Sequence, residues 1–205
     1  MRQTVAFLLT LLAAVFAVPS RACIVTLDQV NEPNGAIFSG ARGWQQEVRA
    51  GKAGRLEQID LYLASPWPQA FVLDVYTTGG LHSSTDWILI EVQVEAPPYQ
   101  GWYSINVAGP YFYLDVGQTF TIGVRGEIPA DDCCNLLGTG PDGSGGYADG
   151  RLYSSFDEDH WFELPNEDLA FRTSVFVPEP ASLVLVGSAL ALMAALARRT
   201  RNAPV

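Results

Sequence analysis

The sequence predicts an all-β protein, an antiparallel two-sheet β-sandwich of the jelly-roll type, flanked by an N-terminal signal peptide and a C-terminal transmembrane helix. Three observations favour this fold class. Apolar and polar residues alternate through the middle of the chain, glycine- and proline-rich turns separate the alternating segments, and two uncharged apolar runs lie near the ends. With 205 residues, 48% of them hydrophobic, the chain can fill one core of ordinary size.

Residues 1–22 have the three parts of a secretory signal peptide. Arg2 supplies a positive charge, Val5 to Val18 form an apolar segment, and Ser20 to Ala22 place small residues at the cleavage site. A retained N-terminal anchor is one alternative, although the apolar segment is shorter than the ~20 residues that span a bilayer. A lipoprotein signal before Cys23 is another, but the residues preceding this cysteine fit it poorly.

Residues 181–197 form a second uncharged apolar run, and a basic stop of Arg198, Arg199 and Arg201 follows it. A helix of this length rises about 25 Å, slightly less than a ~30 Å hydrocarbon core, so flanking residues and snorkelling arginines would complete the span. The arginines favour the cytoplasmic side, which places the preceding domain outside the cytoplasm. A helix buried in a globular core is the alternative.

The residues directly before this run are Val177, Pro178, Glu179 and Pro180. Proline removes a backbone donor and disfavours helix at the residue before it, so an extended segment is expected. Together with the apolar run and the arginines, residues 177–201 resemble the PEP-CTERM sorting signal of Gram-negative bacteria that make exopolysaccharide. This resemblance implies that exosortase, a membrane transpeptidase, recognises Pro178, Glu179 and Pro180. A proline-rich stalk before an ordinary anchor is the alternative.

The resemblance also implies a route through the cell envelope. The precursor would be held in the inner membrane with a periplasmic domain, and the processed protein would reach the cell surface or the extracellular matrix. The exported domain, residues 23–176, has seven basic and 21 acidic residues, a formal charge of −14. This charge repels anionic polymers and lipid headgroups, and it excludes nucleic acid as a partner.

Five segments of this domain alternate with a period of two, which is typical of half-buried antiparallel strands. Five stretches between Gln45 and Val177 resemble an exported sandwich module of PEP-CTERM and related surface proteins. Their sequences are QQEVRAGKAGRLEQIDLYLA, FVLDVYTTGG, GWYSINV, LDVGQTFTIGV and DLAFRTSVFV. This resemblance implies a carbohydrate-binding-like jelly roll. The residues predicted to face the core are Ile59, Leu61, Leu63, Phe71, Leu73, Val75, Ile88, Ile90, Val92, Val94, Phe120, Ile122, Val124, Leu169, Phe171, Thr173 and Val175.

No set of residues in the sequence makes a convincing catalytic site, so we expect no enzyme and no cofactor. A carboxylate and an imidazole could come from Asp157, Glu158, Asp159 and His160, but adjacent residues of an extended chain point to opposite faces. No serine or cysteine nucleophile motif accompanies them, and a solvated acidic loop fits better. His82, in a glycine-rich turn, is interpreted as a surface residue. A polysaccharide-acting hydrolase is the alternative, because two carboxylates from distant strands meet only in the fold.

Aspartates in the glycine-rich stretch between Phe120 and Leu169 are candidate ligands for a structural calcium ion. Hard cations prefer several oxygen ligands, and jelly-roll loops often supply them. The alternative interpretation is that these side chains cap turns and keep the loops solvated. No EF-hand spacing is present. The candidates are Asp142, Asp149, Asp157 and Asp159, with Asp131 and Asp132 in the same stretch.

Three cysteines, Cys23, Cys133 and Cys134, would meet an oxidising compartment if the signal peptide is cleaved. Cys133 and Cys134 are adjacent, so only one of them readily faces Cys23, and a bridge between neighbours would be strained. We expect a disulfide between Cys23 and one of the pair. Three pairings remain open, and sequence alone does not choose between them.

Two tryptophans are candidates for stacking on sugar rings. Trp87 shares its strand side with Glu91 and Gln93, and Trp102 shares its side with Ser104 and Asn106. A sheet face carrying both indoles beside polar groups would suit a pyranose. The alternative is that both rings merely cover the sheet, and Trp67 and Trp161 are loop-borne candidates. The predicted function is that of an envelope-tethered surface or matrix protein associating with exopolysaccharide.

Overall fold

The computed structural model describes residues 23–83, 85–109, 112–126, 134–140, 146–157 and 159–178, with side chains from Ile24 to Val177. The predicted signal peptide, Glu179 and Pro180 of the sorting motif, the apolar run and the three terminal arginines lie outside the described residues. Within these ranges the chain forms strands and turns, and no helix there is long and apolar enough to span a bilayer.

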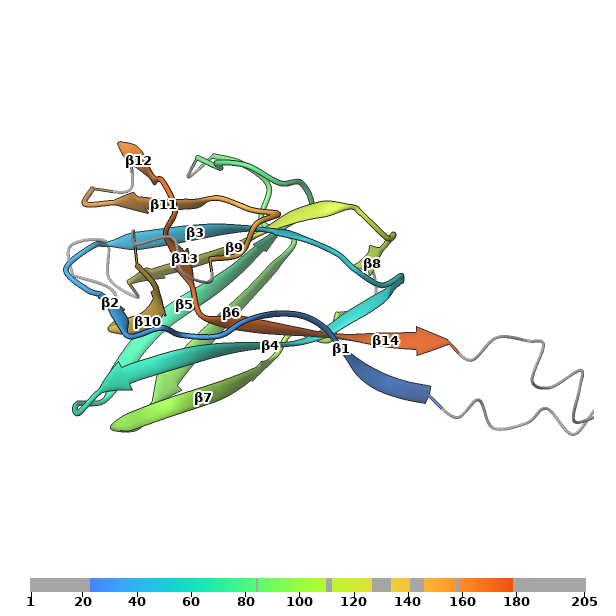
Figure 1. Cartoon of the computed structure of the whole chain (residues 1–205), viewed down its shortest axis with the longest axis horizontal. Helices are drawn as coiled ribbons and strands as arrows, with labels where there is room; N and C mark the ends of the chain where they lie inside the picture. Colours follow the sequence, from blue (N-terminus) through green and yellow to red (C-terminus); the bar gives the residue numbers. More distant parts are fainter. Residues whose placement is uncertain are drawn as a thin grey trace, which may run out of the picture. The chain divides into compact units, whose positions relative to one another are not determined.

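The described residues form two antiparallel sheets packed face to face, which confirms the all-β class (Figure 1). Sheet A contains β1 (Cys23–Asn31), β14 (Phe171–Pro178), β4 (Gly54–Ser65) and β7 (Tyr99–Asn106), with the short strands β2 (Ala36–Phe38), β8 (Tyr113–Leu114), β10 (Leu136–Thr139) and β13 (Asp168–Leu169). Sheet B contains, in spatial order, β12 (Trp161–Leu164), β11 (Leu152–Ser155), β3 (Gly43–Arg49), β9 (Thr119–Gly126), β5 (Gln69–Tyr76) and β6 (Ile90–Ala96).

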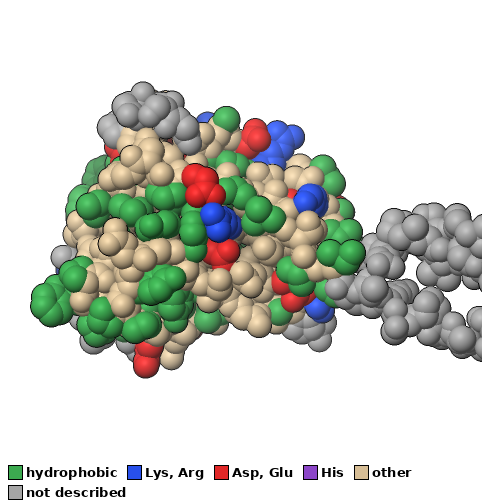
Figure 2. Space-filling model, turned by 60° about the horizontal axis from the view of Figure 1, so that its bottom comes forward, with side chains coloured by type: hydrophobic (Ala, Val, Ile, Leu, Met, Phe, Trp, Pro, Cys, Tyr) green, Lys and Arg blue, Asp and Glu red, His purple; other side chains and the backbone are tan. Residues whose placement is uncertain are grey.

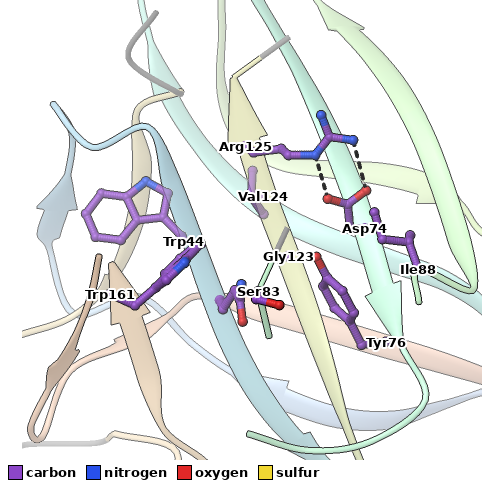
Figure 3. Close-up of a pocket in the computed structure, with 10 residues that line it drawn as sticks. Trp44, Asp74, Tyr76, Ser83, Ile88, Gly123, Val124, Arg125 and Trp161 are labelled. Carbon is purple, nitrogen blue, oxygen red and sulfur yellow. Dashed lines mark hydrogen bonds and ion pairs between the residues drawn. The ribbon is translucent and has the colours of Figure 1, made fainter. Parts of the chain in front are cut away.

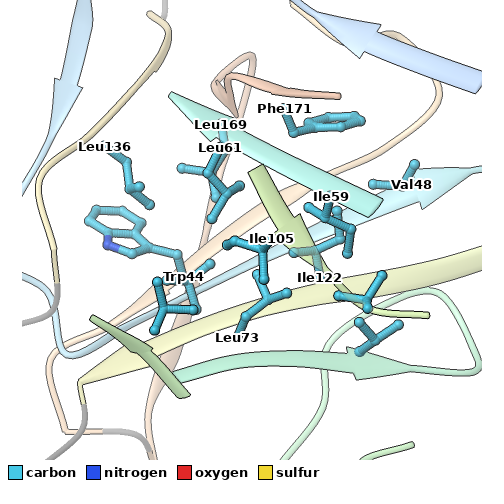
Figure 4. Close-up of a cluster of buried hydrophobic side chains, with 14 of the residues drawn as sticks. Trp44, Val48, Ile59, Leu61, Leu73, Ile105, Ile122, Leu136, Leu169 and Phe171 are labelled. Atoms are coloured by element: carbon cyan, nitrogen blue, oxygen red, sulfur yellow. The ribbon is translucent and has the colours of Figure 1, made fainter. Parts of the chain in front are cut away.

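The core lies between the sheets and is filled by the alternating residues of their inner faces (Figure 4). Ile59, Leu61 and Leu63 of β4 are completely buried, as the period-two pattern predicts. Phe120 of β9 is also completely buried and packs edge-on against Phe112. Burying one such side chain contributes about 1.5–3 kcal/mol, so these alternating positions account for much of the drive to fold.

The predicted strand that includes Trp87 and Ile88 begins later than expected. Strand β6 starts at Ile90, and the preceding residues belong to a loop that leaves β5. Ile90 and Val92 are half-buried against the core because β6 is an edge strand of sheet B.

Strands β1 and β14 lie side by side in sheet A and run in opposite directions. The backbone N–H of Gln29 donates to Thr173 Oγ1 over 3.2 Å. Two residues further along the chain, the side chain of Asn31 donates to the carbonyl of Leu169 over 2.7 Å, and Leu169 precedes Thr173 in the sequence. This order brings the first part of β1 next to the last part of β14. Val25 and Val177 are therefore at the same end of the sheet.

Candidate functional site

The described residues of the loop between β5 and β6, 77–83 and 85–89, fold back over the outer face of sheet B. Gln45 of β3 holds the loop through both ends of its amide, accepting from the His82 N–H and donating to the His82 carbonyl, each over 2.7 Å. Thr121 of β9 donates to the carbonyl of Gly80 over 2.8 Å. These contacts fix the loop on a sheet face that would otherwise be open to water.

His82 is the centre of this attachment, and its prediction as a surface residue is wrong. Its side chain stacks on Tyr76 with ring centroids 4.2 Å apart, and the residue is only 9% exposed. Its Nε2 lies 3.0 Å from the Thr78 carbonyl, and its Nδ1 lies 3.4 Å from a carboxylate oxygen of Asp86. The turn composition indicated a loop, but it gave no sign that the loop lies on the sheet.

A cleft of about 270 Å³ remains beside the loop on the outer face of sheet B (Figure 3). Its lining comes from four strands of the sheet and from the loop: Trp44, Gln45, Asp74, Tyr76, Ser83, Ile88, Gly123, Val124, Arg125 and Trp161. The volume is near the lower limit of the ~300–1,000 Å³ common for ligand sites, so it suits one small ring rather than a large cofactor.

Two glycines let aromatic rings lie close to the sheet at this cleft. A Cβ on Gly43 would come within 3.0 Å of the Trp161 ring, and one on Gly123 would come within 3.1 Å of the Tyr76 ring. Glycine therefore leaves room for both rings. Trp161 is half-buried, begins β12, and pairs with Ser155 of β11. It supplies an indole to the wall opposite Ile88 (Figure 3).

The charged part of the cleft is an arginine held by two carboxylates. Arg125 of β9 bonds through Nε to Asp74 Oδ2 over 2.8 Å and through Nη2 to Glu91 Oε2 over 2.7 Å. The strand register brings these side chains together. Asp74 of β5 lies opposite Gly123 of β9 on one side and opposite Glu91 of β6 on the other. Burial raises the pKa of Asp74, and the bonds from Arg125 oppose this rise.

The cleft thus offers an indole surface next to hydrogen-bonding groups held in fixed positions. Carboxylate oxygens accept bonds, guanidinium N–H groups donate them, and the hydroxyl of Ser83 can do either. Because Asp74 and Arg125 hold each other, neither needs to reorganise when a ligand arrives. Such a site can bind a polyhydroxylated ring by stacking and by hydrogen bonds.

The two tryptophans predicted to share a sheet face do not share one. Trp87 is in the loop, is 81% exposed, and precedes the cleft residue Ile88. Trp102 is on β7 in sheet A, where it points outward as expected. The prediction of a common face is wrong because β6 belongs to sheet B, and the turn at Pro97 and Pro98 takes the chain across to sheet A.

The outward side of Trp102 is occupied by neighbours from its own sheet. The guanidinium of Arg172 lies 3.9 Å from the centre of the indole, and Tyr62 packs edge-on with ring centroids 5.3 Å apart. Arg172 also pairs with Glu32 over 2.8 Å. Sugar stacking on Trp102 stays a prediction, but this cation–π contact covers part of the ring that a sugar would need.

The candidate calcium ligands are not brought together among the described residues, where no group of three or more acidic, histidine or cysteine side chains could hold a metal ion. Asp142 lies outside the described residues. Asp149 lies 3.8 Å from Arg49, and Asp157 accepts bonds from the backbone of Asp159 and His160. Asp157 therefore caps a turn in this structure.

His160 and Asp157 do meet, with Nδ1 and Oδ2 2.6 Å apart. Their hydrogen bond raises the pKa of His160 and contributes to the lowered pKa of Asp157. Ser155 lies near this pair, but the three residues do not form a catalytic serine–histidine–aspartate triad. The hydroxyl of Ser155 is buried and bonds the backbone carbonyl of His160 over 2.7 Å, so it does not face the imidazole as a nucleophile must.

Cys134 is buried and disulfide-bonded. Cys133 lies outside the described residues, and so does the side chain of Cys23. The predicted link between Cys23 and one of the pair stays a prediction.

Sequence reasoning missed most of the cleft, including Gln45, Asp74, Tyr76 and Arg125. One signal could have found it. In the segment FVLDVY, the side of β5 predicted to face solvent carries Val72, Asp74 and Tyr76. Two of these three residues are not polar surface residues, since Val72 is apolar and Tyr76 is aromatic. All three are buried. A strand with bulky residues on both sides indicates that something covers its outer face.

Comparison with models of known protein families gives no match for this chain, and comparison with curated proteins gives none either. The function is therefore inferred from the cleft and from the sequence patterns.

Proposed function

We propose that this chain is an exported, envelope-tethered surface or extracellular-matrix protein that associates with exopolysaccharide through the cleft on sheet B. Export and tethering are supported by the signal-like residues 1–22 and by the PEP-CTERM resemblance of residues 177–201. Exosortase is the proposed processing partner. The two-sheet architecture supports a jelly-roll module, which is the fold class that the resemblance implies.

One observation carries the binding proposal: the cleft joins an indole to a fixed set of polar groups. Trp161 offers a partly exposed ring, and Arg125 offers a partly exposed guanidinium that the buried Asp74 carboxylate fixes in position. Sugar rings have an apolar C–H face and a rim of hydroxyls, so they need both kinds of surface. An arrangement that is ordered before binding loses little conformational entropy on binding.

Titration of the detergent-solubilised full-length protein with the host exopolysaccharide, followed by affinity electrophoresis and by indole fluorescence, tests the proposal. Trp161→Ala should weaken binding by about 2–12-fold, the equivalent of one aromatic contact of about 0.5–1.5 kcal/mol. Trp67→Ala is the matched control, because Trp67 is 72% exposed in the turn between β4 and β5, away from the cleft lining. Equal affinity of wild type and Trp161→Ala would refute the site.

The hydrolase alternative is supported by one observation, the buried cleft carboxyl of Asp74 with its raised pKa. Against it, Asp74 and Glu91 are both bound to Arg125, which keeps them from acting freely as acid and base. Incubation of the protein with exopolysaccharide and measurement of new reducing ends separates the two functions. Release of reducing ends that Asp74→Asn abolishes would favour the hydrolase.

The sorting part of the proposal has its own experiment. Replacement of Pro178, Glu179 and Pro180 by alanine should leave the precursor in the inner membrane of a strain that contains exosortase. Mass spectrometry of the mature wild-type protein should show that residues 181–205 have been removed. A full-length mature protein would contradict this part and leave the binding proposal intact.

A further inference from the structure

The charge of the cleft restricts which saccharides can enter it. Arg125 is the cation in the cleft lining, and it is bound on one side by Asp74 and on the other by Glu91. Two carboxylates against one guanidinium leave an excess of one negative charge at this position. An anionic ligand would therefore meet repulsion where a basic site would attract it.

The other basic side chains of the described residues lie outside the cleft lining. Four further arginines form ion pairs with acids on the described surface: Arg49 with Asp149, Arg55 with Glu57, Arg151 with Glu163 and Arg172 with Glu32. Figure 2 shows the same feature on one face, where blue side chains are scattered and form no continuous basic area. The formal charge of −14 for residues 23–176 adds a long-range repulsion of polyanions.

We propose that the cleft selects neutral hexopyranose units and rejects units that carry carboxylate or sulfate groups. This inference rests on the proposed function and names the ligand class for the same cleft. Uncharged hydroxyls can accept from Arg125, whose guanidinium Asp74 holds in place, and can bond the hydroxyl of Ser83 while the ring stacks on Trp161. A carboxylate on the ligand would have to compete with Asp74 and Glu91 for Arg125.

The test uses polymer pairs that share a backbone and differ in charge. Hydroxyethylcellulose and carboxymethylcellulose form one pair, and methyl-esterified and de-esterified polygalacturonate form another. The full-length protein should bind the neutral member of at least one pair, with at least about tenfold weaker binding of its anionic counterpart at low salt. Salt at 1 M shortens the screening length to about 3 Å. The difference in affinity between the neutral and the anionic polymer should therefore shrink, mainly because the anionic polymer binds more tightly.

A charge-neutralising variant tests whether the cleft causes the selection. Glu91→Gln removes one of the two carboxylates on Arg125. The ratio of the affinity for the neutral polymer to the affinity for the anionic polymer should therefore fall at least threefold. Glu95→Gln is the matched control, since it makes the same change four residues along β6 on the same exposed side, outside the cleft lining. Circular dichroism of both variants checks that they remain folded.

The outcomes separate the two levels of the proposal. Equal or tighter binding of the anionic members overturns the selection and leaves saccharide binding standing. An equal effect of Glu91→Gln and Glu95→Gln also overturns it, because general surface charge would then cause the discrimination. Failure to bind both polymer pairs and the host exopolysaccharide overturns the proposed function together with this inference.

Discussion

Asp168 is the buried carboxyl through which pH should act on the stability of the fold. It begins β13, is only 4% exposed, and accepts bonds from Gln46 Nε2 and from the Tyr147 N–H, each over 2.8 Å. Burial raises its pKa to about 6 from the ordinary 3.8, although both hydrogen bonds favour the charged form. The folded protein therefore holds this proton more tightly than the unfolded chain does.

The sign of the pH effect follows from this difference in proton binding. Between pH 3.8 and about 6 the folded state binds more protons than the unfolded state, so the free energy of unfolding falls as pH rises. A difference of about two pKa units corresponds to about 3 kcal/mol, since each unit is worth about 1.4 kcal/mol. The stabilising effect of the neutral carboxyl is complete below pH 3.8 and is lost above about pH 6.

Asp168→Asn isolates the effect, because the amide keeps the shape of the side chain and does not titrate. Urea unfolding of both proteins at pH 4, 5, 6, 7 and 8 gives the difference in their free energies of unfolding. Wild type should lose up to about 3 kcal/mol relative to the variant between pH 4 and 7, and little more above pH 7. A difference that is flat, or that favours wild type increasingly as pH rises, would refute the reasoning.

Two further substitutions test the core and the close approach of strands, both by urea unfolding at pH 7. Phe120→Ala should cost about 3–5 kcal/mol, because it empties a fully buried site, whereas Phe156→Ala at a residue 62% exposed should change stability by less than about 0.5 kcal/mol. Gly138→Ala should cost about 2 kcal/mol or more, because its Cβ would collide with the Asp168 carbonyl oxygen, while Gly140→Ala has room and serves as control. Similar values for the members of either pair would contradict the packing described above.

The strands of the core could be predicted from sequence because alternation is a local property. Ile59, Leu61 and Leu63 carry it without reference to the rest of the chain, and all three are buried. The sheet to which a strand belongs is not local. Trp87 and Trp102 both stand out of the apolar register, but the chain crosses from sheet B to sheet A between them.

The cleft is non-local in a stronger sense. Asp74 and Arg125 are 51 positions apart, and only the pairing of β5 with β9 brings them together. Gln45 meets His82 across 37 positions, through a loop whose composition indicates only that it turns. Residue type could identify these as polar groups near apolar strands, but their partners depend on register and on a loop that folds back.

The antiparallel contact between β1 and β14 has a mechanical consequence for the tethering proposed above. Because Val25 and Val177 lie at the same end of sheet A, a force that pulls the two chain ends apart would open the hydrogen bonds between these strands one after another. Strands loaded along their length must instead break their bonds together, which takes a larger force. A polymer held at sheet B and an anchor beyond β14 would load the domain across its packed core and leave β1 unstressed. The domain should therefore resist tension between its cleft and its C-terminal strand better than tension between its own two ends.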